Sequence, residues 1–388
     1  MSGEPAGRPS RRGVLLGAGG LVGGAAGGFL LGREAAPATS PAPARPGRPE
    51  PVTAAGRTQA GVARPGTPQA HGLLAVHDMD PAPGALGERL ARLGEAILDL
   101  TAAAPGHPHL PDGAGDLTVT VGLGPALVSA VDPGLPGAED LPGFAGEDSL
   151  DRRHRGGDLL LALHASDPTV LPPALAALRA HLGEDVAPRW TQACWRGPGE
   201  GTISRNPLGH LDGVVVPRGA EELDRHVWLD GPLAGGTVCV VRRLRLDLEG
   251  FGTLDGPAQD AVIGRRRRDG TPLSGGSPSD DVDLSARTPE GQYLVPTGSH
   301  VRAAHPSFTG SELMLRRSYT FAEPDGAGAG GLLFVCFQRS LGTFVRTQQR
   351  LDESDELMRY VTPTASGTFL VLPGFDPGRP LGAPLVGP

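Results

Sequence analysis

Three short segments of the chain carry side chains that can transfer protons, bind metals or stabilise anions. They are residues 205–213 (RNPLGHLDG), 298–306 (GSHVRAAHP) and 313–319 (LMLRRSY). A carboxylate can act as a general acid–base, an imidazole can bind a metal, and a guanidinium is a permanently charged hydrogen-bond donor. Taken alone, each segment is more often a turn, a loop or the solvated end of a strand.

The spacing indicates which side chains are the candidates. Asp212 belongs to a Gly-x-x-Asp-Gly turn, whose flexible glycines let the backbone approach a ligand closely. His300 and His305 share a loop that a proline closes, and Arg316 and Arg317 end an apolar run. The three segments are informative only in combination, because each has a common structural explanation.

The composition removes several classes of function. All 35 basic residues are arginine, because the chain contains no lysine, and this excludes a Schiff-base lysine and a P-loop lysine. The net charge of −8 disfavours a nucleic-acid partner. Cys194, Cys239 and Cys336 lack metal-ligand spacing and lie in apolar stretches. We expect them to be small buried hydrophobic residues.

Residues 1–44 have the pattern of a twin-arginine signal peptide. Arg11 and Arg12 directly precede residues 13–32, which carry no charge and contain nine glycines. Such a run forms a weakly hydrophobic helix, which suits an export signal better than a stable membrane anchor. A retained anchor is the alternative. Residues 45–57 are rich in Pro, Ala and Arg and predict a disordered linker.

Residues 58–205 are predicted to form a first half of mixed helix and strand. The apolar or alternating runs that predict strands are residues 72–78, 117–121 and 158–165. The runs with leucines at helical spacing are residues 83–104 and 172–182. No element is assigned to the segment around Trp190 and Trp195.

Residues 206–388 have a similar rhythm and form the predicted second half. Strands are expected at residues 236–248, 331–338 and 368–372. Helices are expected at residues 257–267 and 353–360. Two similar halves predict an α+β protein with a duplicated ferredoxin-like fold, in which helices pack on two antiparallel sheets.

In their order along the chain, the three segments resemble the motifs of the dye-decolourising peroxidases, haem proteins built from two ferredoxin-like halves. The family pattern is R-x-x-x-G-F-x-D-G-T, then H-[IV]-R-x-x-[NH]-P, then L-x-R-R and an aromatic residue. Further similar segments are residues 56–62, 235–249, 261–275, 331–339 and 344–374. The resemblance therefore extends over nearly the whole predicted mature chain, and it is closest to the exported, twin-arginine branch.

The resemblance implies a haem ligand. His300 matches the residue that gives its imidazole to the haem iron. A neighbouring carboxylate is then expected to hold the other ring nitrogen of this histidine. Asp355 is the first candidate for that carboxylate, and Asp352 and Glu353 lie nearby in the sequence.

The resemblance also implies the groups that act on hydrogen peroxide. Asp212 matches the acid–base that takes a proton from the peroxide and returns it to the departing oxygen. Arg316 matches the arginine that stabilises negative charge as the O–O bond breaks, and Arg317 is the alternative. The family pattern D-G-T-x-N-P is D-G-V-V-V-P in this chain, so a hydroxyl and an amide side chain are missing.

The remaining contacts to the haem are expected from residues beside these groups. Besides His300 and Arg316, the residues that match are Gly213, Val214, Val215, His305 and Pro306. His305 is expected to line the edge of the haem and not to bind the iron.

The function expected from the resemblance is that of a haem peroxidase with one haem b per chain. It would reduce hydrogen peroxide and oxidise bulky or phenolic, dye-like electron donors outside the cytoplasm. The alternative is a deferrochelatase-like haem- and iron-handling protein that works with the permease and lipoprotein of an iron-uptake system. A third hypothesis is a secreted ferredoxin-like binding domain without haem. A homo-oligomer is left open.

Overall fold

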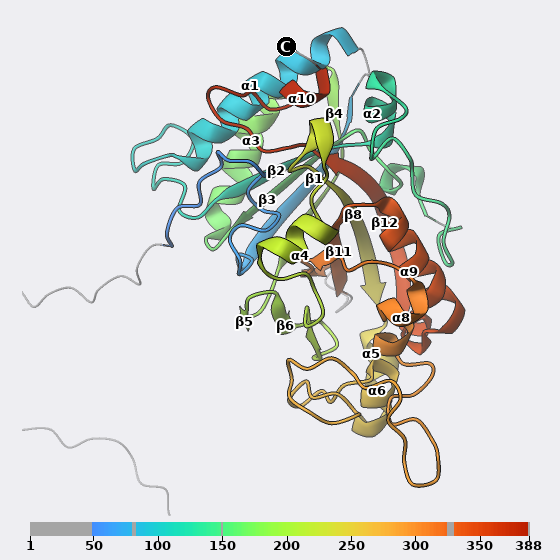
Figure 1. Ribbon diagram of the computed structural model, residues 1–388. Helices are drawn as coiled ribbons and strands as arrows, with labels where there is room; N and C mark the ends of the chain where they lie inside the picture. Colours follow the sequence, from blue (N-terminus) through green and yellow to red (C-terminus); the bar gives the residue numbers. More distant parts are fainter. Residues whose placement is uncertain (1–48, 80–82, 149, 324–329, 387–388) are drawn as a thin grey trace, which may run out of the picture. The chain divides into compact units, whose positions relative to one another are not determined.

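The computed structural model describes residues 49–388 except 80–82, 149, 324–329 and 387–388 (Figure 1). The predicted signal peptide lies outside the described residues, and its assignment stays a prediction. Of the predicted linker, residues 49–57 are described and contain no helix or strand. They are nevertheless held in place, because Ala54 is buried and the Gly56 N–H donates to the Phe375 carbonyl at 3.0 Å. Among the described residues, no helix has both the length and the apolar character that a membrane span requires.

The N-terminal half follows the order strand, helix, strand, strand, helix, strand. Its strands are β1 (His71–Met79), β2 (Thr118–Leu123), β3 (Leu159–Ala165) and β4 (Val186–Trp195). Its two long helices are α1 (Pro83–Thr101) and α3 (Leu171–Leu182). The strands pair in the order β4-β1-β3-β2, and every pairing is antiparallel. This is the arrangement of a ferredoxin-like unit.

The C-terminal half repeats that arrangement. Its strands are β8 (Thr237–Leu246), β9 (Leu315–Arg316), β10 (Tyr319–Ala322), β11 (Gly330–Gln338) and β12 (Val361–Val371). Its crossing helices are α5 (Leu248–Gly252), α6 (Gly256–Ile263) and α9 (Leu341–Ser354). β9 and β10 both pair with β11, and when they are counted as one strand, the order β12-β8-β11-β9 repeats the order of the first half, numbered within each half. The predicted α+β class with antiparallel strands is confirmed.

The two halves join into one closed ring of strands. Leu370 of β12 pairs with Leu123 of β2, and Thr320 of β10 pairs with Trp195 of β4. The inward-facing residues form a common core, which includes Leu74, Val241 and Phe369 among many others. A ring buries one face of each strand without leaving an exposed sheet edge between the halves.

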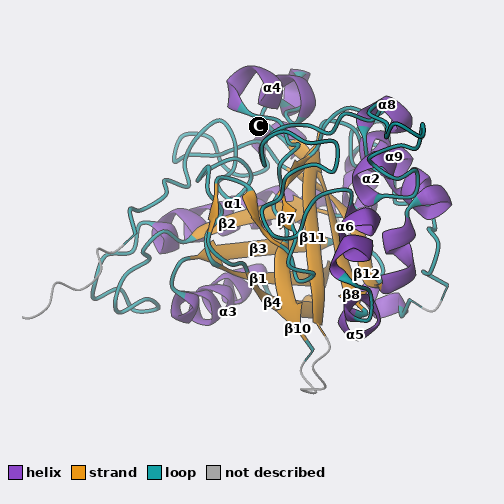
Figure 2. Cartoon of the chain, turned by 90° about the horizontal axis from the view of Figure 1, so that it is seen from below, coloured by secondary structure: helices purple, strands orange, loops and turns teal. Residues whose placement is uncertain are grey.

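Helices cover the outer faces of the ring (Figure 2). On β1, Leu74 belongs to the inner core, whereas its neighbour Ala75 packs with Leu93 of α1. On β8, Val241 faces inward, whereas Val240 packs with Phe344 of α9. This alternation follows from the period of two along a strand. It also explains why strands that are covered on both sides have nearly continuous apolar sequences.

The remaining elements are short. The helices are α2 (Pro125–Val131), α4 (Gly219–His226), α7 (His300–Ala303), α8 (Pro306–Thr309) and α10 (Ala383–Val386). The strands β5 (Gly199–Glu200), β6 (Ile203–Arg205) and β7 (Leu211–Asp212) form a separate small sheet. The 3₁₀ helices are η1 (Arg152–His154), η2 (Pro168–Val170), η3 (Gly231–Leu233) and η4 (Glu356–Tyr360). The three cysteines are buried and free, as expected.

Several elements differ from the sequence-based expectation; β12, for example, begins at Val361 and not at residue 368. The segment around Trp190 and Trp195 forms β4, whose mixed burial and internal proline hide the strand pattern. The helix expected at residues 353–360 is in fact the end of α9 followed by η4. α9 contains few apolar residues, and its buried side includes polar ones, among them Thr347 and Gln348, so apolar spacing alone does not reveal this helix.

Candidate active site

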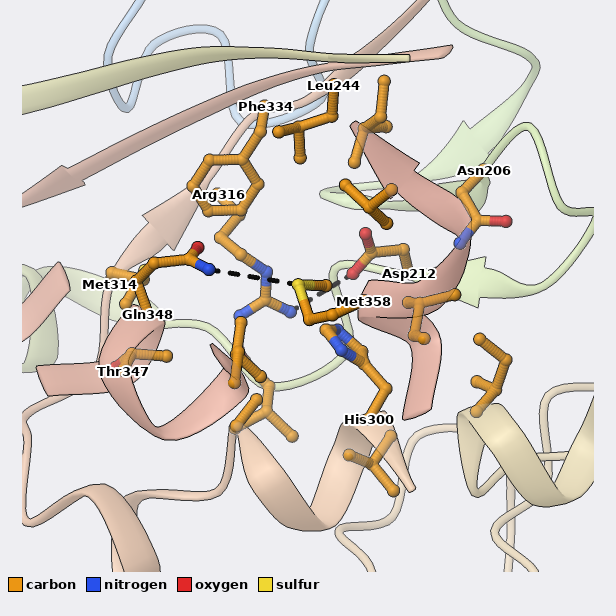
Figure 3. Close-up of a pocket in the computed structure, with 18 of the residues that line it drawn as sticks. Asn206, Asp212, Leu244, His300, Met314, Arg316, Phe334, Thr347, Gln348 and Met358 are labelled. Carbon is orange, nitrogen blue, oxygen red and sulfur yellow. Dashed lines mark hydrogen bonds and ion pairs between the residues drawn. The ribbon is translucent and has the colours of Figure 1, made fainter. Parts of the chain in front are cut away.

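A cavity of about 320 Å³ lies in the C-terminal half and gathers the three segments singled out from the sequence. Its apolar lining includes Leu244 and Leu246 of β8 and Leu332 and Phe334 of β11. The His300 side chain points from α7 towards Arg316 and Asp212 (Figure 3). The cavity is therefore largely apolar along β8 and β11, and Asp212, His300 and Arg316 face it from β7, α7 and β9.

The His300 imidazole is held by a carboxylate. Asp355 Oδ2 lies 2.6 Å from His300 Nδ1, and the Asp355 side chain is fully buried. The other carboxylate oxygen accepts the Leu357 N–H at 2.9 Å, which caps η4. A backbone bond from Glu356 N to the Gly298 carbonyl ties the two loops together. With Nδ1 engaged, Nε2 is the ring nitrogen of His300 that can bind a metal.

Asp212 is presented by a small hairpin. Asp212 on β7 pairs with Ser204 on β6, and the hairpin loop is closed by Asn206, whose side-chain oxygen accepts the His210 N–H at 3.1 Å. The Arg205 guanidinium donates to the backbone carbonyl of Gly209 at 2.6 Å, across the same loop. In residues 205–213, Arg205 and Asn206 therefore stabilise the turn, and Asp212 supplies the carboxylate.

Arg316 and Arg317 point to opposite sides of one strand. Arg316 lines the cavity, donates to Asp212 Oδ1 at 3.3 Å and to the Val215 carbonyl at 2.9 Å. Arg317 is 4% exposed and donates to the Pro65 carbonyl at 2.8 Å, outside the cavity. Because side chains alternate along an extended strand, only one of two consecutive arginines can face the site.

The charges of the site act on one another. Burial by itself raises the pKa of the Asp212 carboxyl, but Arg316, the Gly213 N–H and His300 outweigh it, so the pKa lies below its usual value. Burial lowers the pKa of the His300 imidazole, but Asp355 outweighs that effect and the pKa is raised. Asp212 is therefore an ionised carboxylate over a wide pH range.

The other residues predicted to contact a cofactor also line this cavity. They are Gly213, Val214, Val215, His305 and Pro306. Both ring nitrogens of His305 are engaged, since Nε2 lies 3.1 Å from Asp281 Oδ2 and Nδ1 accepts the Ser307 N–H at 3.1 Å. Of the two histidines, His300 is the one with a ring nitrogen left for a metal.

The structure adds a residue that the sequence did not single out. Arg242 on β8 lines the cavity, although it is only 2% exposed. It pairs with the equally buried Glu147 at 2.5 Å, and its guanidinium lies over the Phe144 ring. Its Nε has no hydrogen-bond partner in the described part of the chain. The signal in the sequence was weak, because Arg242 is one of three arginines in β8, together with Arg243 and Arg245.

Comparison with known proteins identifies the class. The family model for the N-terminal domain of Dyp-type peroxidases matches residues 59–196, and the C-terminal model matches residues 203–376. The chain therefore belongs to the Dyp-type peroxidase family, and it is an oxidoreductase of the peroxidase class. The boundary of the two matches lies near the predicted boundary of the two halves, and the domain limits themselves stay predictions.

The proteins similar to this chain include a dye-decolorizing peroxidase and deferrochelatases. The dye-decolorizing peroxidase of Thermobifida fusca is 37% identical over 327 residues, which are 77% of this chain and 74% of that protein. The deferrochelatase of Shigella flexneri serotype 5b is 30% identical, and 94% of both chains is covered. The solved oxyferrous/water mixed complex of DtpA from Streptomyces lividans is 32% identical, has a TM-score of 0.80 and covers 88% of this chain and 98% of its own.

Proposed function

We propose that this protein is a haem-dependent peroxidase that reduces hydrogen peroxide while it oxidises bulky or phenolic, dye-like electron donors. One haem b per chain would lie in the cavity. The observation that carries the proposal is a carboxylate-supported histidine that points across an apolar cavity towards an ionised Asp–Arg pair. The iron-containing complex of the Streptomyces lividans relative supports the choice of cofactor.

The residues present fit a haem. Its apolar ring would pack against the leucines of β8 and β11, and His300 Nε2 would bind the iron. The unpartnered Nε of buried Arg242 is a donor that a carboxylate at the edge of the haem would satisfy. When bound, the haem would supply the two electrons that cleave the peroxide O–O bond, and the electron donor would return them in single-electron steps.

Asp212 transfers protons, and Arg316 stabilises the negative charge that develops. Asp212 accepts the proton of the peroxide hydroxyl and donates it to the departing oxygen, which leaves as water. Arg316 donates hydrogen bonds to the oxygen on which negative charge develops. Its contact with the Val215 carbonyl fixes the guanidinium in place before the reaction begins.

An absorption spectrum followed by a peroxide titration tests the proposal. The purified protein is expected to show a Soret band equivalent to one haem per chain. Added peroxide is expected to change that band within the mixing time, and a phenolic donor is expected to restore it. A protein that is purified with haem supplied and shows no Soret band would be a binding domain without haem.

The second candidate is removal of iron from haem beside an iron-uptake permease and lipoprotein. It is favoured by the relatives named deferrochelatase, which align with nearly the whole chain. The two candidates differ in their product. Iron removal leaves a metal-free porphyrin, which fluoresces, whereas peroxidase turnover leaves the haem loaded and oxidises the donor. We expect donor oxidation without porphyrin fluorescence, and fluorescence rising in step with iron release would reverse the order of the candidates.

We further propose that the protein is exported by the twin-arginine route. The support is Arg11 and Arg12 directly before an uncharged, glycine-rich run. Changing both arginines to alanine is expected to retain the protein in the cytoplasm, because the pair is what this route reads. Continued export of the variant would point to another route, and wild-type protein in the membrane fraction would indicate a retained anchor.

A further inference from the structure

A chain of three hydrogen bonds leads from the end of the N-terminal half to the Asp212 carboxylate. Arg196 Nη2 donates to the Thr202 carbonyl at 3.1 Å. Thr202 Oγ1 donates to the Gly213 carbonyl at 2.8 Å, and Gly213 N donates to Asp212 Oδ1 at 2.6 Å. The first two bonds join residues that are 6 and 11 positions apart in the sequence, whereas the last joins neighbouring residues.

The first link is anchored in the main sheet. Arg196 directly follows β4, and its N–H donates to the Ala70 carbonyl at 2.9 Å, immediately before β1. Its side chain is held in the interior, because the residue is only 8% exposed. Burial lowers the pKa of this guanidinium, and the nearby Tyr319 and Asp212 oppose that shift. The hairpin that carries Asp212 is thus tied to a buried, rigid point of the N-terminal half.

The second link depends on a close approach of two backbones. Gly213 has a φ of +82°, and a Cβ added at this residue would overlap the Thr202 carbonyl. Only glycine adopts this conformation and leaves that space free. The contact brings the Thr202 hydroxyl onto the Gly213 carbonyl and holds the peptide between Gly213 and Val214, which adjoins the peptide whose N–H is on Asp212.

The three residues after Gly213 are valines, so no side-chain hydroxyl or amide can hold this turn from within its own sequence. The carbonyls of the turn are held from outside instead. Thr202 binds the carbonyl of Gly213, Arg218 binds that of Val214 at 2.8 Å, and Arg316 binds that of Val215. Of these three donors, Thr202 is a neutral hydroxyl, whereas Arg218 and Arg316 are charged guanidinium groups.

We propose that Thr202, whose carbonyl is held by Arg196, is a positioning residue for Asp212: its hydroxyl fixes the Gly213 carbonyl and so restrains the Gly213 backbone, whose N–H stays on the carboxylate. The inference rests on the proposed function for its effect on rate, but the hydrogen-bond chain itself is a property of the protein without substrate. Loss of the hydroxyl frees the peptide after Gly213 and so loosens the Gly213 backbone, and the carboxylate then holds its N–H donor and its orientation less firmly.

The test compares Thr202→Val, which keeps the shape and removes the hydroxyl, with Thr202→Ser, which keeps the hydroxyl. Thr253→Val is a matched control, because Thr253 Oγ1 also donates to a glycine carbonyl, that of Gly250 at 2.7 Å, at an exposed turn. Hydrogen exchange of peptides that contain Gly213 is measured with the full-length protein. The rate of the haem absorbance change on mixing with peroxide is measured from pH 4 to 8.

Thr202→Val is expected to increase exchange at Gly213 and to slow the peroxide reaction by about 2- to 10-fold, the range of one ordinary hydrogen bond. Its rate is expected to fall at a higher pH than that of wild type, because the carboxylate holds its Gly213 N–H donor less firmly. Thr202→Ser and Thr253→Val are expected to match wild type in both measurements.

Three results would overturn the inference. They are unchanged exchange at Gly213 in Thr202→Val, faster exchange without any loss of rate, and a Thr202→Ser variant that behaves like Thr202→Val. If the wild type neither loads haem nor reacts with peroxide, the proposed function fails, and the exchange measurement still decides whether Thr202 restrains the Gly213 backbone.

Discussion

Asp355 Oδ2 lies 2.6 Å from Nδ1 of His300, although 54 residues separate the two in the chain. Asp352 and Glu353 are adjacent in the sequence but have other partners. Asp352 accepts from Gln348 at 2.7 Å, and Glu353 pairs with Arg350 at 3.4 Å. Of these three carboxylates, Asp355 is the one that can set the orientation and basicity of the histidine ring.

Asp355→Asn is expected to weaken haem binding by about 10- to 100-fold, the usual effect of removing a carboxylate behind a metal-binding histidine. The measurement is the rate of haem transfer to a haem-free acceptor protein. Glu353→Gln is the matched control, because its side chain is mostly exposed. Equal transfer rates in both variants would remove Asp355 from this role.

His300→Ala is expected to abolish haem loading, whereas His305→Ala is expected to retain it. The physical reason is that both ring nitrogens of His305 are already engaged, while His300 keeps Nε2 for the iron. Soret absorbance per protein chain measures the loading. Loss of haem from the His305 variant alone would contradict the assignment of the ligand.

Asp212→Asn is expected to slow the reaction with peroxide by about 10²- to 10⁴-fold while haem stays bound, because the general base is lost. In wild type the Asp212 pKa lies below its usual value. The ionised form is therefore present above that depressed pKa and is lost only as the pH falls through it. We expect a fast reaction down to about pH 4, whereas a histidine base would lose activity near pH 6.5. Stopped-flow absorbance from pH 4 to 8 checks both statements.

Arg316→Leu is expected to slow the same step by about 10²- to 10³-fold, because the charge that stabilises the departing oxygen is lost. It is also expected to raise the Asp212 pKa, because Arg316 has the largest effect among the groups that lower this pKa. The loss of rate in acid should then begin at a higher pH. Arg317→Leu is the control, because Arg317 faces the interior and donates to the Pro65 carbonyl. A variant at Arg317 that is as slow as the Arg316 variant would contradict the geometry.

Glu147→Gln is expected to lower the free energy of unfolding by about 3–5 kcal/mol, because it leaves the buried Arg242 guanidinium without its counter-charge. The two side chains are 3% and 2% exposed. Glu221→Gln breaks an exposed pair with Arg225 and is expected to cost less than about 1 kcal/mol. Urea unfolding of the haem-free proteins measures both, and equal losses would show that the Arg242 pair is not the stabilising feature.

The sequence by itself determined the class of fold and most of its elements. The periodicity that predicts α1, β3 and β11 is local, because each of these segments buries a regular set of apolar side chains. The motif order likewise pointed to a peroxidase, and the family models agree with that interpretation.

Two features of the fold depend on tertiary contacts and cannot be predicted from local sequence patterns. β4 is a strand because it pairs with β1 along most of its length, and the polar side of α9 is buried because it borders the cavity. Both depend on partners far away in the sequence.

The same holds for the candidate site. The sequence favoured Arg316 and left Arg317 as the alternative, and it offered Asp355, with Asp352 and Glu353 nearby, as the carboxylate for His300. Strand alternation on β9 turns Arg316 to the cavity, and the cap of η4 turns Asp355 to the histidine. The residue type determines the chemistry of a side chain. Which neighbour the side chain contacts depends on the pairing of strands and loops from both halves, and only the closed fold brings these together.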